Sequence, residues 1–340
     1  MTPSARSAAG FGAISYIWGA VAYNGLLAGL AYLARPTPGM FRPTLVGARE
    51  LLSFGMISAA VTVVNVAYDL LPRLAFGRML GFGAVGLYAR ALTVTQLPDR
   101  AVVSALQPVV LPAMAAHARA GGDLKSAYLR GHELMTAFQW PMLAMLALLA
   151  DPVVRLLLGA QWTEVPPLVR PAALGMMALA PAFMTFPVLV AVGRVRDTLI
   201  SSLISLPPSV AIVIGAAHFG GLSAVAASVL VVAPLQMAVA LLFIRRAIGL
   251  RMREMVAASA ASAGLVLTTL ALPLLVVALS PHGLALGWVE TAVAVAGAGV
   301  GWLAGLRLFR HPISAEIAGA WQMVVQGMFR GGRVPAAGAE

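Results

Sequence analysis

The chain has 340 residues, of which 60% are hydrophobic and 10% are charged, and its mean hydropathy is +0.90. A soluble domain carries about 25% charged residues, so this composition excludes a soluble globular protein. The net charge of +11 would suggest a nucleic-acid partner for a soluble protein, whereas in a membrane protein an excess of Lys and Arg marks cytoplasmic loops. We therefore expect an all-α polytopic membrane protein with no nucleic-acid partner.

Nine apolar runs are long enough to cross a bilayer, for which about 20 residues suffice. In chain order they are 11–34, 51–78, 84–114, 126–149, 168–192, 198–217, 222–244, 255–279 and 286–306. Prolines in the second, third and fifth runs predict kinks or breaks, at Pro72, Pro98, Pro108, Pro112, Pro181 and Pro187. The glycines of GRMLGFGAVG, residues 77–86, predict a tight turn between two membrane helices.

The distribution of positive charge predicts the orientation of the chain, because short loops rich in Lys and Arg stay in the cytoplasm. Most basic residues follow the first, third, fifth, seventh and ninth runs. This alternation places the amino terminus in the periplasm and the carboxyl terminus in the cytoplasm. Residues 311–340 are expected to form an amphipathic helix and a flexible tail on the cytoplasmic membrane surface.

Ionisable and polar residues within spanning helices are costly and are therefore candidates for function. The candidates that could line a cationic cavity are Arg73, Arg90, Arg100, Asp69, Asp99 and Gln107. Guanidinium groups in such a cavity would hold phosphate oxygens in bidentate hydrogen bonds. A purely structural alternative stays open, in which Asp69 with Arg73, and Asp99 with Arg100, only satisfy one another.

No residue pattern indicates catalysis or a resident cofactor. The chain has no cysteine, and its five histidines lie in separate segments without metal-ligand spacing. A Walker-type phosphate loop is also missing from the sequence. We therefore expect no catalytic residue, no metal site and no cofactor, and a protein that is not an enzyme.

Four segments, in order, resemble the oligosaccharide flippases of the polysaccharide transporter (Wzx-type) branch of the multidrug/oligosaccharidyl-lipid/polysaccharide exporter superfamily. They are the helix entry LLSFG at 51–55, the turn GRMLG at 77–81 with the following GLYARA and QLP, the loop LLADPVVRLLLGAQW at 148–162, and VAVGRVRDTL at 190–199. The likeness extends from about residue 41 to about residue 250, and in helix order to about residue 308. The chain departs from the family locally, since Asp69 precedes Arg73 here whereas members tend to carry Arg followed by Asp.

The resemblance implies fourteen spanning helices with both termini in the cytoplasm, of which this chain would lack the first five. Residues 1–40 would then hold the last helix of the first bundle, 41–250 the second bundle, 251–310 two additional helices and 311–340 the tail. Reading about 150 codons of upstream DNA in frame should reveal five further apolar runs, if the resemblance holds.

The resemblance further implies a flippase that moves an undecaprenyl-pyrophosphate-linked oligosaccharide across the bacterial inner membrane. Its partners would be the lipid-linked oligosaccharide, the membrane, and the polysaccharide polymerase and other assembly proteins that make lipopolysaccharide, exopolysaccharide or capsule. Two alternatives stay open: a truncated, non-transporting membrane protein of a polysaccharide gene cluster, or a small-molecule exporter of the same superfamily.

Overall fold

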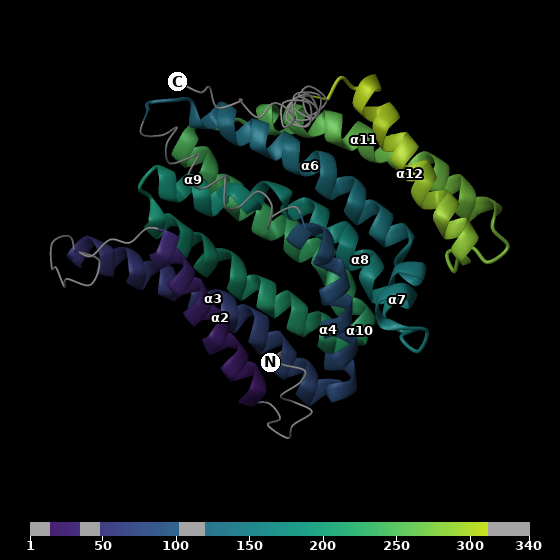
Figure 1. The fold of residues 1–340 in the computed structure, drawn as a ribbon, viewed down its shortest axis with the longest axis horizontal. Helices are drawn as coiled ribbons and strands as arrows, with labels where there is room; N and C mark the ends of the chain where they lie inside the picture. Colours follow the sequence, from purple (N-terminus) through teal and green to yellow (C-terminus); the bar gives the residue numbers. More distant parts are fainter. Residues whose placement is uncertain (1–13, 35–47, 102–119, 312–340) are drawn as a thin grey trace, which may run out of the picture. The chain divides into compact units, whose positions relative to one another are not determined.

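The computed structural model describes residues 14–34, 48–101 and 120–311, and every regular element in these ranges is helical (Figure 1). The all-α prediction is therefore confirmed. The elements are α2 Ile14–Ala34, α3 Ala48–Met79, α4 Phe82–Thr95, α6 Leu124–Leu148, α7 Ala150–Leu158, α8 Pro166–Met176, a 3-10 segment Met177–Met184, α9 Thr185–Ala191, α10 Val195–Ile248, α11 Met252–Leu279 and α12 Trp288–Leu308.

The contacts divide the chain into two compact units, Met1–Ser53 and Phe54–Glu340. The first unit contains α2 and the start of α3, and the second contains all the later helices. The four-part organisation expected from the sequence stays a prediction. Residues 312–340 of the expected amphipathic tail lie outside the described residues, and so does the candidate site residue Gln107.

Within the described ranges, five helices are long and apolar enough to cross a membrane, or six if the bent pair α6 and α7 forms one span. The fold is that of a polytopic membrane protein. The expected runs do not correspond one to one to helices of the structure. For example, the runs 198–217 and 222–244 both lie in the 54-residue α10. Gly221, with φ 65° and ψ −156°, is a non-helical residue inside α10 and marks the boundary between the two runs.

The prolines act differently in different helices. The fifth expected run is divided as predicted, because α8 passes into the 3-10 segment that contains Pro181 and then into α9 with Pro187. In contrast, α3 continues as a helix through Pro72. The tight turn predicted between the second and third runs is confirmed at Gly81, whose φ of 85° favours glycine.

Side chains of α6 hold the 3-10 segment in place. The Tyr128 hydroxyl donates to the carbonyl of Pro181 at 3.0 Å, and the Trp140 indole N–H donates to the carbonyl of Met177 at 2.8 Å. A break in the α-helical hydrogen-bond ladder leaves backbone groups without their usual partners, which is costly in a bilayer. These two donors therefore stabilise the irregular segment within the helix bundle.

The helices α8 and α10 pack against each other, and α6 packs between α8 and α11, with α12 beside α11 (Figure 1). Polar side chains link α6 to α11: His132 Nε2 lies 2.9 Å from the Ser259 hydroxyl, and the Thr136 hydroxyl lies 2.8 Å from that of Ser262. Small polar residues of this kind allow membrane helices to approach closely and to form hydrogen bonds between them.

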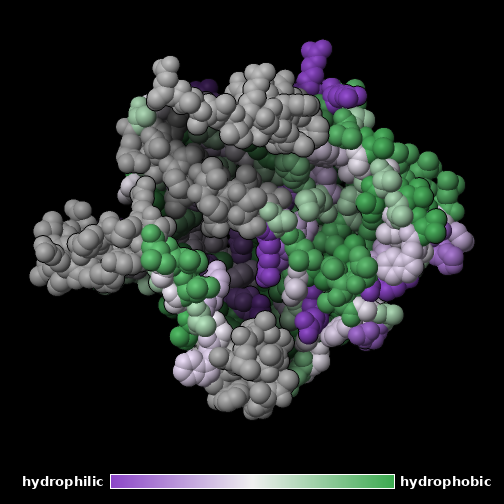
Figure 2. Space-filling model, in the orientation of Figure 1, coloured by the Kyte–Doolittle hydropathy of each residue, from purple (hydrophilic) through white to green (hydrophobic). Residues whose placement is uncertain are grey.

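The outer surfaces of α11 and α12 are apolar. Figure 2 shows hydrophobic residues over the right-hand side, where Figure 1 places these two helices. The exposed side chains include Leu267, Leu279, Val289, Val300 and Leu303. An exposed apolar surface of this extent is typical of a lipid-facing surface.

We predict that Gly221→Ala lowers the thermal unfolding midpoint of the detergent-purified protein. The φ and ψ angles of Gly221 fall in a region that only glycine occupies readily, and forcing another residue there costs about 1–3 kcal/mol. Gly215→Ala in the same helix is the matched control, because a Cβ there meets no atom within 4 Å. Equal midpoints for the two variants would contradict the backbone assignment at Gly221.

Candidate functional site

A pocket of about 200 Å³ lies between α3, α4, α8 and α10, and we call it the polar pocket. Its aliphatic walls carry a cluster of side chains that can form hydrogen bonds. These are Tyr68, Asp69, Arg73, Tyr88, Thr95, Gln96 and Gln236.

The charged pair of the polar pocket lies on α3. The Nη2 atom of Arg73 is 2.8 Å from Oδ1 of Asp69, as their spacing of four residues in a helix allows. The Arg73 side chain is 36% exposed, and its Nε is buried and has no hydrogen-bond partner among the described residues. Asp69 thus orients the guanidinium through Nη2, whereas Nη1 takes part in no hydrogen bond within the described ranges and can donate to an acceptor in the pocket.

The aromatic and amide side chains of the polar pocket come from separate helices. Tyr68 lies on α3 and Gln236 on α10, and the Gln236 amide donates to the Ser209 hydroxyl at 3.2 Å. The Tyr88 ring packs edge-on against Phe76, with 5.4 Å between the ring centroids. These contacts fix hydroxyl and amide groups around the Arg73 charge.

Arg100 lies next to the polar pocket without lining it. Its Nη2 donates to Oε1 of Gln96 at 3.0 Å, and Gln96 is part of the pocket wall. Arg90 lies elsewhere, with its guanidinium 5.5 Å from the centre of the Trp162 ring. The cation–π contact thus holds Arg90 away from the pocket that contains Arg73.

Asp99 is buried and accepts a hydrogen bond from the Gln139 amide at 2.6 Å. The local pair of Asp99 with Arg100, offered by the sequence as a structural alternative, is not formed, whereas the Asp69–Arg73 pair is. The reason is geometric, because adjacent residues of a helix project in different directions and residues four apart share a face. The binding roles of all six candidates stay predictions.

Several polar-pocket residues were not among the sequence candidates: Tyr68, Tyr88, Thr95 and Gln236. Gln236 carried a usable signal, because it is the one side-chain amide in the otherwise apolar run 222–244. A polar residue in that position is costly unless it has partners or a function. The tyrosines gave no comparable signal, since they are common at membrane interfaces.

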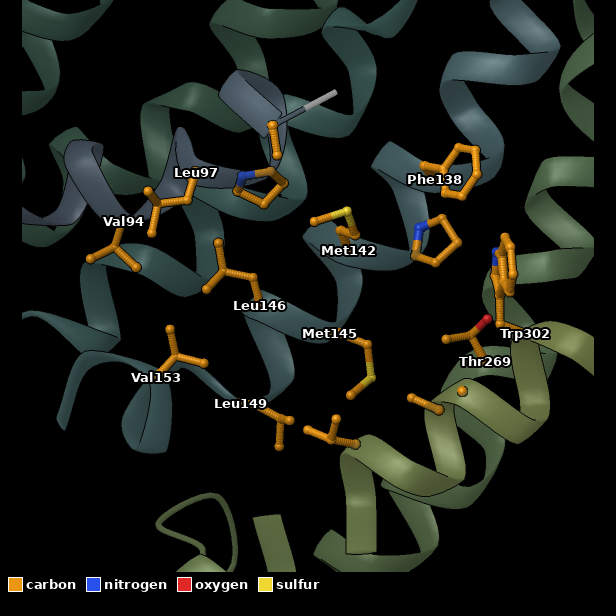
Figure 3. A pocket seen from close by; sticks show the side chains of 16 residues that line it. Val94, Leu97, Phe138, Met142, Met145, Leu146, Leu149, Val153, Thr269 and Trp302 are labelled. Atoms are coloured by element: carbon orange, nitrogen blue, oxygen red, sulfur yellow. The ribbon is translucent and has the colours of Figure 1, made fainter. Parts of the chain in front are cut away.

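Residues 82–101 comprise α4 and the helical residues that follow it, and we call them the α4 segment. A second, larger cavity of about 700 Å³ lies on the other side of this segment, and we call it the apolar groove. Its lining is almost entirely aliphatic, aromatic and methionine side chains from the α4 segment, α6, α7, α11 and α12. Figure 3 shows Leu97 and Trp302 on opposite sides of this space, with Met142 and Met145 of α6 between them. Neighbouring residues thus serve different cavities: Val94 and Leu97 line the groove, while Thr95 and Gln96 line the polar pocket.

Within residues 14–34, 48–101 and 120–311, no group of three or more His, Asp or Glu side chains is arranged to hold a metal ion. The charged side chains of the polar pocket are instead one cation, Arg73, and its carboxylate partner, Asp69. This arrangement can bind an anion that also presents hydrogen-bonding groups to the tyrosines and glutamines.

Comparison with known proteins gives two matches. A family model described as "Polysaccharide biosynthesis protein" matches residues 5–167. The succinoglycan biosynthesis transport protein ExoT of Rhizobium meliloti (strain 1021) is 28% identical over 169 residues. The two matches support a polysaccharide transporter family. Their names describe transport and biosynthesis of polysaccharide, and they point to a transporter rather than a catalytic enzyme.

The match to the succinoglycan transport protein is partial in both chains. It covers 49% of this chain and 34% of that protein, so this chain matches about a third of the length of its relative. No solved structure matches the chain. The family model and the relative's name agree with the polysaccharide side of the resemblance found in the sequence.

Proposed function

We propose that the protein takes part in moving an undecaprenyl-pyrophosphate-linked oligosaccharide from the cytoplasmic to the outer leaflet of the bacterial inner membrane. The product would be used for surface polysaccharide, for which exopolysaccharide is favoured by the similarity to a succinoglycan transport protein. The observation that carries this proposal is the polar pocket, in which the Arg73 guanidinium lies among hydroxyl and amide side chains.

The chemistry of such a substrate matches the side chains of the polar pocket. A diphosphate is an anion with several acceptor oxygens, and a guanidinium such as that of Arg73 suits it. Sugar hydroxyls both donate and accept, as do the Tyr68 hydroxyl and the Gln96 and Gln236 amides in the same pocket. A polar headgroup would otherwise lose several kcal/mol for each unsatisfied group in hydrocarbon.

The presence of a polar and an apolar cavity on two sides of the α4 segment also supports a substrate with two chemically different ends. The polar pocket lies on one side and the apolar groove on the other. An isoprenoid chain has no groups to satisfy and can remain in contact with lipid and apolar side chains while the headgroup crosses. A soluble, wholly polar substrate would not need both surfaces.

The test is a leaflet-accessibility assay in proteoliposomes that contain the purified chain and a fluorescent undecaprenyl-pyrophosphate oligosaccharide. A membrane-impermeant reagent that destroys the label acts only on the outer leaflet. If the proposal holds, the accessible fraction rises from the outer-leaflet pool toward all of the label. An accessible fraction that equals that of protein-free vesicles would contradict translocation by this chain, and export of a soluble dye from the same vesicles would favour a small-molecule exporter.

A further inference from the structure

The Asp99 carboxyl is placed in an environment that suits its protonated form. Asp99 is 6% exposed and Gln139 is fully buried, and the amide Nε2 of Gln139 donates to Oδ1 of Asp99 at 2.6 Å. The other polar atom of the amide, Oε1, is buried and has no hydrogen-bond partner among the described residues. The pair thus contains an acceptor that lacks a donor.

No described cation compensates a charge on Asp99. Arg100 is turned to Gln96, and Asp99 takes part in no ion pair within the described ranges. The titratable groups on the elements around this segment are engaged elsewhere or lie at helix ends. They are Arg90 over Trp162, Arg155 over Trp288, His132 at Ser259, Glu133 beside Arg130, the ion pairs Arg73–Asp69, Lys125–Glu254 and Arg170–Asp151, Arg253 at the start of α11, and Glu290 and Arg307 at the two ends of α12.

Protonation of Asp99 would remove the uncompensated charge and would also supply a hydrogen-bond donor for Oε1 of Gln139. An ionised carboxylate that is buried without a cation carries a large desolvation cost. A protonated carboxyl can donate from Oδ2 to Oε1 of Gln139 while it still accepts from Nε2. The acid and the amide then form two parallel hydrogen bonds, and the orphaned Oε1 acquires its donor.

We propose that Asp99 and Gln139 form a proton-binding site, with the proton held on the Asp99 carboxyl in this conformation. The site lies one helical turn from Gln96 of the polar pocket, in the same segment as Arg100. Release of the proton would create a negative charge beside the cationic pocket and weaken its attraction for an anion. The last step, which couples the proton to substrate binding, rests on the proposed function.

Infrared spectroscopy of the purified full chain in lipid nanodiscs tests the site directly. At neutral pH the wild type should show a protonated-carboxyl C=O band that Asp99→Asn loses and Asp151→Asn keeps. Asn can retain two hydrogen bonds to the Gln139 amide, so this variant is expected to fold. Gln139→Leu should keep the band but move it to higher wavenumber, because the carboxyl loses its hydrogen-bonding partner.

Three outcomes would overturn the proposal. One is a neutral-pH band that is unchanged in Asp99→Asn, which would mean that Asp99 is ionised. The second is a band that does not move in Gln139→Leu. The third is loss of the wild-type band on addition of NaCl at constant pH, because a sodium ion would then occupy the site in place of the proton.

The same variants separate this inference from the proposed function. If the chain translocates the fluorescent lipid-linked probe, the wild-type rate should depend on an imposed pH gradient and the Asp99→Asn rate should not. An equal dependence in both would overturn the coupling. If no translocation is detected with the wild type, the proposed function fails, whereas the infrared band still decides whether Asp99 binds a proton.

Discussion

Replacing Arg73 with Gln is expected to abolish translocation of the lipid-linked probe and to weaken its binding by about 10- to 100-fold. A hydrogen bond to a charged group contributes about 1.5–3 kcal/mol, and each 1.4 kcal/mol is about tenfold in affinity. The change also leaves Asp69 without its partner, so that a negative charge remains in the pocket that receives the diphosphate. Repulsion therefore adds to the loss of attraction.

Two further variants make the Arg73 experiment specific. Arg73→Lys keeps the positive charge but loses the planar fork, and it should retain part of the binding. Arg78→Ala removes a charge from an exposed position near the end of α3 that does not line the polar pocket, and it should bind the probe like the wild type. Equal loss in the Arg73 and Arg78 variants would show that the overall charge matters, and unchanged binding in Arg73→Gln would remove Arg73 from the site.

Membrane insertion is the necessary companion measurement. Arg73 lies in the span candidate Gly55–Met79, and its salt bridge to Asp69 is within one helix. Loss of that bridge changes no contact between helices, so the Gln variant is expected to accumulate in the membrane at the wild-type level. A variant that fails to accumulate would report on folding, and Arg73→Lys then becomes the decisive comparison.

Sequence reasoning succeeded where a feature depends on neighbours along the chain. Hydrophobic runs predicted helices, the glycines predicted the turn at Gly81, and Pro181 predicted the break that the 3-10 segment provides. The spacing of Asp69 and Arg73 likewise predicted their ion pair, because residues four apart in a helix lie on the same face. Each of these follows from local backbone geometry.

The sequence does not indicate contacts between residues that are distant along the chain. Arg90 and Arg73 were candidates for one cavity, but the Arg90 guanidinium lies over the Trp162 ring and does not line the polar pocket. Gln139 and Gln236 come from other helices, and no periodicity of the α4 segment indicates which of its faces meets them. The charged residues of the polar pocket could thus be predicted from the sequence, but the uncharged residues that surround them could not. Tertiary packing decides which helix faces meet.

Gly301→Ala is expected to destabilise the protein more than any other single-methyl change in α12. Gly297, Gly301 and Gly305 are spaced by four residues and face α11, where small residues permit close helix packing. A Cβ at Gly301 would lie 2.1 Å from the carbonyl oxygen of Thr268 and 2.9 Å from its carbonyl carbon. These are backbone atoms of another helix, so the clash can be relieved only if the two helices move apart.

Gly299→Ala is the matched control for this prediction. It lies two residues away in the same helix, and a Cβ there meets no atom within 4 Å. The control should be neutral or stabilising, since Ala is favoured over Gly within a helix by about 0.5–1 kcal/mol. Gly301→Ala should instead cost about 1–3 kcal/mol, which is typical of overpacking.

Thermal unfolding of the detergent-purified variants, followed by tryptophan fluorescence, measures the difference. Trp302 of α12 packs against Phe138 and donates to the carbonyl of Ala137, both on α6, and Trp288 lies beside Arg155 of α7. The fluorescence of these two tryptophans therefore reports on the packing of α12 in the bundle. The Gly301 variant should unfold at a lower temperature than the wild type, and the Gly299 variant at the same or a higher one. If both variants unfold together, the close approach of the two helices at Thr268 is refuted. If they differ as expected, the wall of the apolar groove that α12 supplies depends on glycine packing against α11.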